Sequence, residues 1–243
     1  MYSFTSRVRY SECDERLHLT IPAFLNYLQD CSMFHCEHIG HGFAYCAEHH
    51  FAWFVIAWQI EVARLPAHTE EIRIRTWCYE MTPTVAKRFF TIEDASGATI
   101  VRADSLVVAF DTNLGRAARI PDAERVFVSD EKPDFPPTKR KIKLNGTGEK
   151  LFEMPVTERL IDTNGHVNNV QYVAIAEDAI RMRDKDFELG RMYVQYRTAA
   201  HLGDTMHVWL YAEDGDYSVS IADKDGNSYA VVRMERRGPC ARK

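Results

Sequence analysis

The chain has 243 residues, of which 46% are hydrophobic and 27% are charged, and its formal net charge at pH 7 is -5. This composition suits a globular protein with a full core and excludes disordered, collagen-like and disulfide-scaffold proteins. The acidic balance argues against a general nucleic-acid binder, which usually carries a basic surplus. The length allows one or two domains.

The sequence shows neither a membrane span nor a secretion signal. The longest mainly apolar stretch, residues 51–60, is too short to cross a bilayer, and residues 1–10 lack the apolar core of a signal peptide. Irregularly spaced cysteines without a C-x-x-C pair favour reduced thiols in a cytoplasmic protein. They are Cys13, Cys31, Cys36, Cys46, Cys78 and Cys240. From the charge and the short apolar stretch we expect no nucleic-acid partner and no membrane partner.

The first long element along the chain is a predicted helix over residues 20–37. Thr20 is expected to cap it, and Pro22 lies in the first turn, where its missing N–H costs little. Its buried face repeats at i, i+4, i+7 and i+11 and consists of Phe24, Leu28, Cys31 and His35. Short turns between the next elements indicate an antiparallel sheet, with strands at residues 53–62, 70–79, 85–93 and 98–110.

Residues 129–150 have the composition of a linker, with three prolines, two glycines and many charges. Beyond it, a second helix is predicted over residues 168–182, with Asn168 or Asn169 as its cap. Its apolar face holds Tyr172, Ile175, Ala176 and Ala179. Further strands are predicted at residues 191–198, 205–212, 217–222 and 228–236.

The two sides of the linker resemble each other. Placing His18 on His166 also places Asp14 on Asp162, and two further matches follow in the same order, 71–75 with 205–209 and 92–97 with 221–226. Three ordered matches indicate an internal duplication. The sequence therefore predicts an α+β protein with two domains, residues 1–128 and 151–243, each with a helix packed on an antiparallel sheet.

The densest polar cluster is D-x-N-G-H-V-N-N-x-x-Y at residues 162–172. It leads into the second predicted helix, whose first unpaired N–H groups can polarise a carbonyl. Asp162, Asn164 and His166 could supply a nucleophile or base, an orienting hydrogen bond and a proton shuttle. The purely structural alternative, a turn followed by a helix cap, accounts for only part of the cluster.

This run resembles the signature of acyl-acyl-carrier-protein (acyl-ACP) thioesterases. The earlier run R-Y-S-E-C-D-E, followed by L-N-Y-L-Q-D-C-S, is similar to the start of bacterial members. The resemblance implies a tandem (double) hot-dog fold, in which each half is a long helix wrapped by a curled antiparallel β-sheet. It also implies hydrolysis of fatty acyl-ACP thioesters, which ends fatty-acid synthesis, without metal or organic cofactor.

Residue by residue, Asp162, Asn164 and His166 match the family's catalytic Asp, Asn and His. Our mechanistic hypothesis has Asp162 as nucleophile or general base, with His166 and Asn164 orienting the water and the thioester. In the resembling enzymes the first half mainly shapes the acyl tunnel. Bulky residues there are candidates for lining it, with ordinary core packing as the alternative: Phe24, Met33, Phe34, Trp53 and Trp58.

The second half departs from the family pattern. Many members carry a Glu shortly after the Tyr of the next strand, where this chain has Ala199 and Ala200. Either Asp162 is a sufficient general base by itself, or the hydrolytic activity is weak. The alternative function is that of a non-catalytic acyl-binding protein. His201 is a conceivable substitute, but we interpret it as an ordinary surface-loop histidine.

The first half carries a degenerate copy of the motif. Asp14 and His18 resemble its Asp and His, but Leu17 stands where the motif has Gly. We interpret this loop as a relic or a structural turn rather than a second active site.

Two further clusters suggest a binding function but also have a simpler structural interpretation. Residues 31–50 are rich in Cys and His but lack the paired spacing of a zinc site, so we expect no metal. The basic run Lys139, Arg140, Lys141 and Lys143 could dock an acidic carrier protein, although a solvated linker is the simpler interpretation. We expect acyl carrier protein as the partner, acyl-CoA as the alternative substrate, and a monomer or homodimer.

Overall fold

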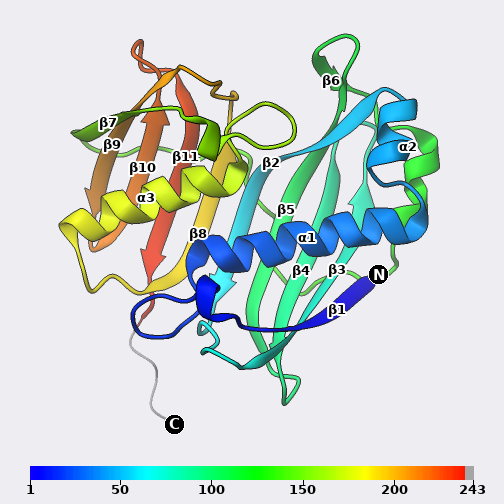
Figure 1. Cartoon of the computed structure of the whole chain (residues 1–243), viewed down its shortest axis with the longest axis horizontal. Coiled ribbons are helices and arrows are strands. Elements are labelled where there is room, and N and C mark those ends of the chain that lie inside the picture. Colours follow the sequence, from blue (N-terminus) through cyan, green and yellow to red (C-terminus); the bar gives the residue numbers. More distant parts are fainter. Residues whose placement is uncertain (239–243) are drawn as a thin grey trace. The chain divides into compact units, whose positions relative to one another are not determined.

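The computed structural model describes residues 1–238, so Cys240 lies outside the described residues. The chain divides into two compact units, with the division between Thr138 and Lys139. Each unit has a long helix that lies across an antiparallel sheet (Figure 1). This is the α+β arrangement that the sequence predicts.

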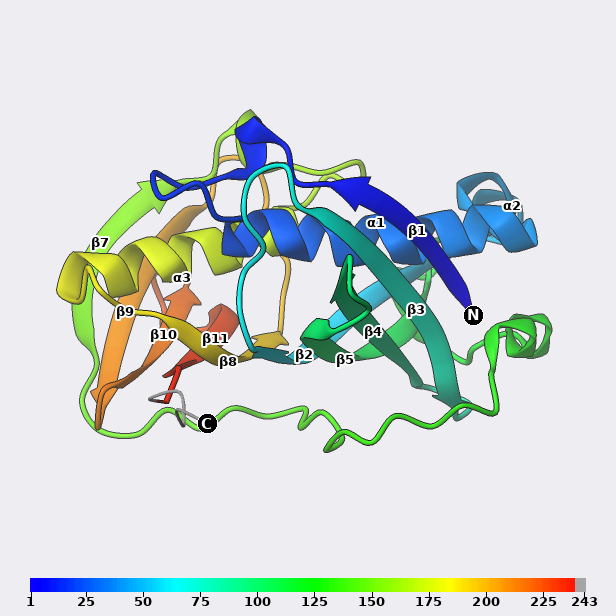
Figure 2. The same ribbon diagram turned by 90° about the horizontal axis from the view of Figure 1, so that it is seen from below.

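The first unit has the strand order β1-β3-β4-β5-β2, and β6 pairs with β5. All of these pairings are antiparallel, and α1 crosses the sheet (Figure 2). The elements are β1 (Tyr2–Arg7), α1 (Ile21–Ile39), α2 (Phe43–Glu48), β2 (Phe51–Val62), β3 (Glu71–Met81), β4 (Ala86–Asp94), β5 (Thr99–Asp111) and β6 (Arg116–Ala118), with 3₁₀ turns at Tyr10–Glu12 and Asp122–Phe127.

The second unit repeats this topology with the strand order β7-β9-β10-β11-β8. Each of its strands takes the place in the order that its counterpart takes in the first unit. The elements are β7 (Glu149–Pro155), a 3₁₀ turn (Glu158–Leu160), α3 (Asn169–Arg183), β8 (Leu189–Tyr196), β9 (Thr205–Glu213), β10 (Asp216–Ala222) and β11 (Ser228–Arg236).

The turns at the end of the third matched region also coincide. The N–H of Asp94 donates to the carbonyl of Ala98 at 2.9 Å, and that of Asp223 donates to the carbonyl of Asn227 at 3.0 Å. Gly97 and Gly226 in these turns have φ values of 83° and 86°, a conformation that favours glycine. Together with the shared strand order, these turns support the internal duplication.

Both long helices begin where the sequence places their caps. Thr20 Oγ1 accepts the N–H of Ala23 at 3.3 Å at the start of α1, and Asn168 Oδ1 accepts the N–H of Val170 at 2.9 Å at the start of α3. Gly40, with φ 85°, ends α1 in a left-handed C-cap. The predicted stripes are buried: Phe24, Leu28, Cys31 and His35 in α1, and Tyr172, Ile175, Ala176 and Ala179 in α3.

The short elements α2 and β6 are absent from the sequence-based expectations, because neither is long enough to show a period. The predicted strand at residues 191–198 ends earlier, at Tyr196. The N–H groups of Arg197 and Thr198 both point to the carbonyl of Tyr229, at 2.8 and 3.4 Å, which ends regular pairing there. No helix among the described residues is long and apolar enough to cross a membrane.

The part of the predicted linker (residues 129–150) that belongs to the first unit, residues 129–138, runs along the side of that unit's sheet opposite α1 (Figure 2). Trp77 Nε1 donates to the carbonyl of Glu131 at 2.8 Å. Asp104 Oδ2, buried beneath the segment, accepts the N–H of Thr138 at 2.9 Å, and its burial raises the pKa of the Asp104 carboxyl. The segment is thus hydrogen-bonded to the first unit as far as Thr138, although its composition is that of a solvated loop.

Candidate active site

Residues 160–168 form a tight loop that leads into α3. The N–H of Asp162 donates to the carbonyl of His166 at 2.8 Å, and the N–H of Gly165 donates to the carbonyl of Asp162 at 3.1 Å. Gly165 has φ 76°, in the left-handed region that glycine adopts without a Cβ clash. The loop therefore closes on itself and holds the aspartate and the histidine at its two ends.

The side chains that the sequence predicts to be catalytic gather on this loop. Asp162 Oδ1 accepts the N–H of Asn164 at 2.8 Å, and Asn164 Nδ2 lies 3.5 Å from Asp162 Oδ2. Asp162 and His166 are half-buried and Asn164 is exposed. A carboxylate, an amide and an imidazole thus share one short loop, with the carboxylate oriented by its neighbours.

Hydrogen bonds close the loop at its base and tie it to the segment that follows β8. The N–H of Val167 donates to the carbonyl of Ala200 at 3.0 Å, and the N–H of Asn168 donates to the carbonyl of Leu160 at 2.8 Å. The hydroxyl of Tyr172 accepts the N–H of Ala200 at 3.0 Å. Burial raises the pKa of Tyr172 to about 12, so its hydroxyl is neutral at physiological pH.

A second tyrosine supports the first turn of α3. Tyr196 donates its hydroxyl hydrogen to the carbonyl of Asn169 at 3.1 Å, and its ring lies 6.1 Å from that of Tyr172 between centroids. Burial raises the pKa of Tyr196 above its ordinary value. The two neutral hydroxyls therefore hold the helix start and the site loop in place.

A further histidine meets the site. The ring of His201 packs edge to face on the ring of His166, with centroids 4.8 Å apart and an interplanar angle of 87°. His201 lies on an exposed loop, as its sequence context predicts, but the sequence does not predict its contact with His166. Sequence spacing gave no signal for it, because the two residues meet only through the fold.

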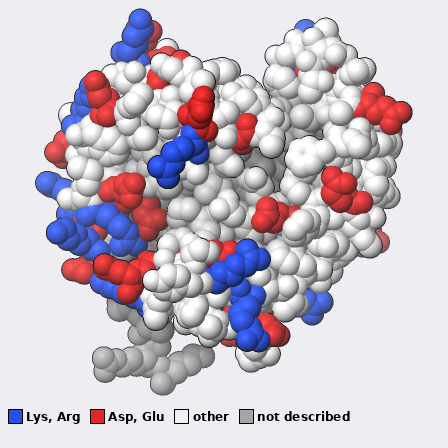
Figure 3. Space-filling view, viewed as in Figure 1, with Lys and Arg blue, Asp and Glu red and all other residues white. Residues whose placement is uncertain are grey.

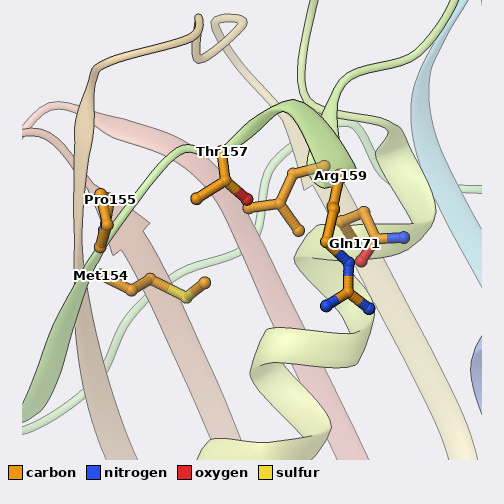
Figure 4. Close-up of a pocket in the computed structure, with 6 residues that line it drawn as sticks. Met154, Pro155, Thr157, Arg159 and Gln171 are labelled. Carbon is orange, nitrogen blue, oxygen red and sulfur yellow. The ribbon is translucent and has the colours of Figure 1, made fainter.

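A pocket of about 330 Å³ lies beside the loop in the second unit. Figure 4 shows Met154 and Pro155 at one end and Arg159 with Gln171 at the other, with Thr157 between them. Leu160 also lines it. The pocket therefore adjoins the chain segment that enters the site loop, and it combines apolar walls with one cationic side chain.

The predicted acyl-lining residues of the first unit lie in different environments. Phe24 and Trp58 are buried, and Trp58 contacts Phe90 with centroids 5.2 Å apart. Met33 and Trp53 are half-buried. Phe34 is 45% exposed and packs edge to face on Phe4. Their part in binding an acyl chain stays a prediction.

The Cys- and His-rich stretch of residues 31–50 engages separate partners. His35 Nδ1 lies 3.0 Å from an Arg88 guanidinium nitrogen, and His41 Nδ1 lies 3.0 Å from Glu124 Oε1. Burial, aided by Arg88, lowers the pKa of His35 to about 3, and burial raises the pKa of Glu124. Within residues 1–238, no group of three or more His, Cys, Asp or Glu side chains is placed to hold a metal ion.

The loop of the first unit at residues 12–20 has the same backbone scheme as the site loop. The N–H of Asp14 donates to the carbonyl of His18 at 2.8 Å, and the N–H of Leu17 donates to the carbonyl of Asp14 at 3.0 Å. Leu17 has φ 58° at the position of Gly165. Asp14 and His18 are therefore brought together as Asp162 and His166 are.

Family models match both units. The model of the acyl-ACP thioesterase N-terminal domain matches residues 1–126, and that of the acyl-ACP thioesterase C-terminal domain matches residues 148–234. The chain is 31% identical over 168 residues to a chloroplastic acyl-[acyl-carrier-protein] hydrolase of Cuphea viscosissima, covering 64% of this chain and 41% of the relative. It is 24% identical over 231 residues to a chloroplastic palmitoyl-acyl carrier protein thioesterase of Gossypium hirsutum, covering 89% and 56%. The chain thus spans about half the length of these relatives.

Solved structures share the fold across both units of the chain. An acyl-ACP thioesterase from Bacteroides thetaiotaomicron superposes with a TM-score of 0.86 at 19% identity and covers 97% of both chains. A 12:0-ACP thioesterase from Umbellularia californica superposes with a TM-score of 0.85 at 21% identity and covers 97% of this chain and 96% of the other. These likenesses confirm the predicted tandem hot-dog fold.

Proposed function

Because the chain belongs to the acyl-ACP thioesterase family, we propose that it hydrolyses the thioester of fatty acyl-ACP and releases a free fatty acid. The observation that carries this proposal is the loop at the start of α3. There the backbone joins Asp162 to His166 at 2.8 Å, and Asn164 orients the carboxylate. Thioester hydrolysis needs a group that activates water or attacks the carbonyl, and groups that steady both reactants.

In this proposal Asp162 acts as general base or as nucleophile. As a base, its carboxylate takes a proton from water while the water oxygen adds to the thioester carbonyl carbon. His166 and Asn164 orient the water and the thioester. The carbon–sulfur bond then breaks, the carboxylic acid is released, and the sulfur leaves with the bonding electron pair and takes up a proton.

The start of α3 supports charge stabilisation in this step. Asn168 uses its side chain to cap the N–H of Val170, and other N–H groups of the first turn add partial positive charge beside the loop. Such groups lower the energy of the oxyanion that forms when water adds to the carbonyl. No metal or organic cofactor is part of the proposed chemistry.

We assign the acyl chain to the first unit and the chemistry to the second. The support is the set of large apolar side chains around α1 and β2, among which Met33 and Trp53 are only half-buried. A chain packed against them would bury more apolar surface, at roughly 25 cal/mol per Å². Replacing Met33 or Trp53 by Ala should therefore change the preferred acyl length, with less effect on a short acyl thioester.

A non-catalytic acyl-binding protein is the alternative function. It is motivated by Ala199 and Ala200, which stand where many members of the family carry a Glu. An acyl-CoA thioesterase is a closer alternative, with the same chemistry on a different thiol. Asp162 and His166 favour the hydrolase, because a binding protein has no need of a carboxylate and an imidazole on one loop.

A panel of acyl-ACP thioesters with different chain lengths, run beside the matching acyl-CoA thioesters, tests the proposal. We expect release of free acid and thiol from acyl-ACP, at higher kcat/KM than from acyl-CoA. Tight binding without turnover would favour the acyl-binding alternative. The same panel would give the preferred chain length.

We further propose that acyl carrier protein docks through the basic run at Lys139, Arg140, Lys141 and Lys143. Carrier proteins are acidic, and this run is a concentrated positive charge in a chain of net charge -5. On the face shown in Figure 3, positive and negative side chains are interspersed.

A cytoplasmic location is proposed because the cysteines of the described residues, Cys13, Cys31, Cys36, Cys46 and Cys78, are free thiols.

A further inference from the structure

The turn that follows β8 carries an imidazole into contact with the site loop. The ring of His201 meets the ring of His166 edge to face, with centroids 4.8 Å apart. The chemistry assigned to Asp162, Asn164 and His166 makes no use of this ring. His201 is therefore a titratable group at the site that still lacks a role.

The turn holds His201 firmly. The N–H of His201 donates to Asp204 Oδ2 at 2.8 Å, and the N–H of Asp204 donates to the carbonyl of His201 at 3.0 Å. Tyr229 donates its hydroxyl hydrogen to the same carboxylate at 3.3 Å. The N–H of Gly203 donates to the carbonyl of Val156 at 3.2 Å, which fixes the turn to the segment after β7.

The first unit builds the same turn without an imidazole. The N–H of Ala67 donates to Glu70 Oε2 at 2.9 Å, and the N–H of Glu70 donates to the carbonyl of Ala67 at 3.1 Å. Ala67 thus takes the place of His201, and Glu70 takes the place of Asp204. Arg64 pairs with Glu70 at 2.6 Å and neutralises it. Because an alanine satisfies this turn, the backbone does not require the histidine.

Exposure distinguishes the two imidazoles of the site. The side chain of His201 is 61% exposed, whereas His166 is half-buried. In an acyl-carrier thioester the apolar chain is the part that gains from burial, and the thiol arm must reach a carrier protein in solvent. Of the two imidazoles, His201 is therefore the one that a thiol arm extending into solvent would meet first. Asp204 Oδ2 lies 3.9 Å from His201 Nδ1, so a carboxylate stands beside the ring.

We propose that His201 is the general acid of the reaction and donates a proton to the departing sulfur. The inference rests on the proposed function. When the carbon–sulfur bond breaks, its electron pair stays on sulfur, and the proton on the His201 ring converts the thiolate into a thiol. The proton that Asp162 took from water then leaves to solvent, and His201 regains one from solvent, so protons and charge balance over a turnover.

Leaving-group dependence tests the proposal. An alkyl thioester expels the more basic thiolate, whose departure a proton donor assists, whereas a 4-nitrothiophenyl ester of the same acid expels a weakly basic thiolate that gains little from a proton donor. His201→Ala should lower kcat on the alkyl thioester about 100-fold, the lower end of the usual effect of general acid–base catalysis, and should leave kcat on the aryl thioester within about threefold. KM should change little on both.

His201→Phe separates the acid from the ring contact. It keeps an aromatic ring against His166 but carries no proton, so it should be as slow as His201→Ala on the alkyl thioester. The control is His68→Ala, which removes a histidine from the corresponding turn of the first unit and should leave both rates unchanged. Thermal unfolding midpoints of all variants show that the turn still folds.

The outcomes separate this inference from the proposed function. Equal losses on both thioesters, or a His201→Phe variant with full activity, would overturn the acid role while leaving thioester hydrolysis intact. Asp162→Ala should lower both rates together, because water activation precedes loss of either thiol. A wild-type chain that hydrolyses neither ester would overturn the proposed function and this inference with it.

Discussion

The two loops that lead into α1 and α3 share a backbone and differ in the side chains it presents. In both, the aspartate N–H donates to the histidine carbonyl at 2.8 Å. In both, the residue before the histidine has positive φ, 58° at Leu17 and 76° at Gly165. The hot-dog fold therefore supplies the loop twice, and the choice of side chains decides whether the loop can perform chemistry.

The carboxylates of the two loops are used differently. Asp14 Oδ1 accepts two backbone N–H groups, those of Arg16 and His18, at 2.9 and 2.8 Å. Asp162 Oδ1 accepts the N–H of Asn164, and the Asn164 amide lies near its second oxygen. Asp14 thus acts as the acceptor of a tight turn, which supports its interpretation as a structural relic.

The largest expected effect comes from removing each carboxylate in turn. Asp162→Ala should lower kcat for acyl-thioester hydrolysis about 1,000-fold, within the range for loss of a general base. Asp14→Ala should leave kcat within about twofold and cost only stability, because it removes a turn acceptor. Initial rates and thermal midpoints measure both. Similar losses of kcat in the two variants would mean that both loops are catalytic.

A second difference is the imidazole buried in the first unit. Burial and Arg88 lower the pKa of His35 from 6.5 to about 3, so the unfolded chain binds the extra proton more readily. Above pH 6.5 the ring is neutral in both states, so its titration does not change the free energy of unfolding. As the pH drops from 6.5 towards 3, the free energy of unfolding falls by about 1.4 kcal/mol per pH unit. His35→Gln keeps an acceptor for Arg88 and removes this slope.

Urea unfolding of the wild type and of His35→Gln across this pH range measures the slope. The matched control is His201→Gln in the second unit, where the side chain is largely exposed and should leave the slope as it is. An unchanged slope in His35→Gln would show that other groups cause the acid sensitivity.

Exchanging the residue at positive φ sharpens the comparison further. Gly165→Leu copies Leu17 into the site loop. A Cβ at Gly165 would meet no atom within 4 Å, so the cost is the left-handed backbone alone, about 1 kcal/mol of stability. We expect kcat to fall about tenfold, because Leu17 is 47% exposed and its copy would project over the site.

The reverse exchange, Leu17→Gly, serves as the control and should leave kcat unchanged. Chemical unfolding gives the stability change of each variant, and initial rates give kcat. If Gly165→Leu kept full activity, Leu17 could not be the reason why the first-half loop is expected to lack catalytic activity.

The smallest effect concerns carrier docking. Reversing Lys139, Arg140 and Lys141 to Glu should raise KM for acyl-ACP about fivefold, since rim charges act mainly on association. KM for a small acyl thioester should stay the same, and the acyl-ACP effect should shrink at high salt. Equal changes of KM for both substrates would contradict docking through this run.

The sequence predicted the long elements well because their periodicity is local. The stripes of α1 and α3 and the caps Thr20 and Asn168 are found where the pattern places them. It gave no indication of α2, and the composition of residues 129–150 concealed that Thr138 is bound to Asp104, with Oγ1 2.7 Å from Oδ2. Hydrogen bonds between distant residues leave no trace in composition.

The sequence by itself determined the fold class, the duplication and the clustering of Asp162, Asn164 and His166. These follow from the order of the matched segments, the periodicity of apolar residues and the short spacing within the motif, all of which are local and do not depend on the tertiary fold. Tertiary structure alone decided that His201 meets His166, that an alanine serves in the equivalent turn of the first unit, and that both loops share one backbone. Those facts depend on strand pairing and helix packing, which bring together residues that sequence spacing does not connect.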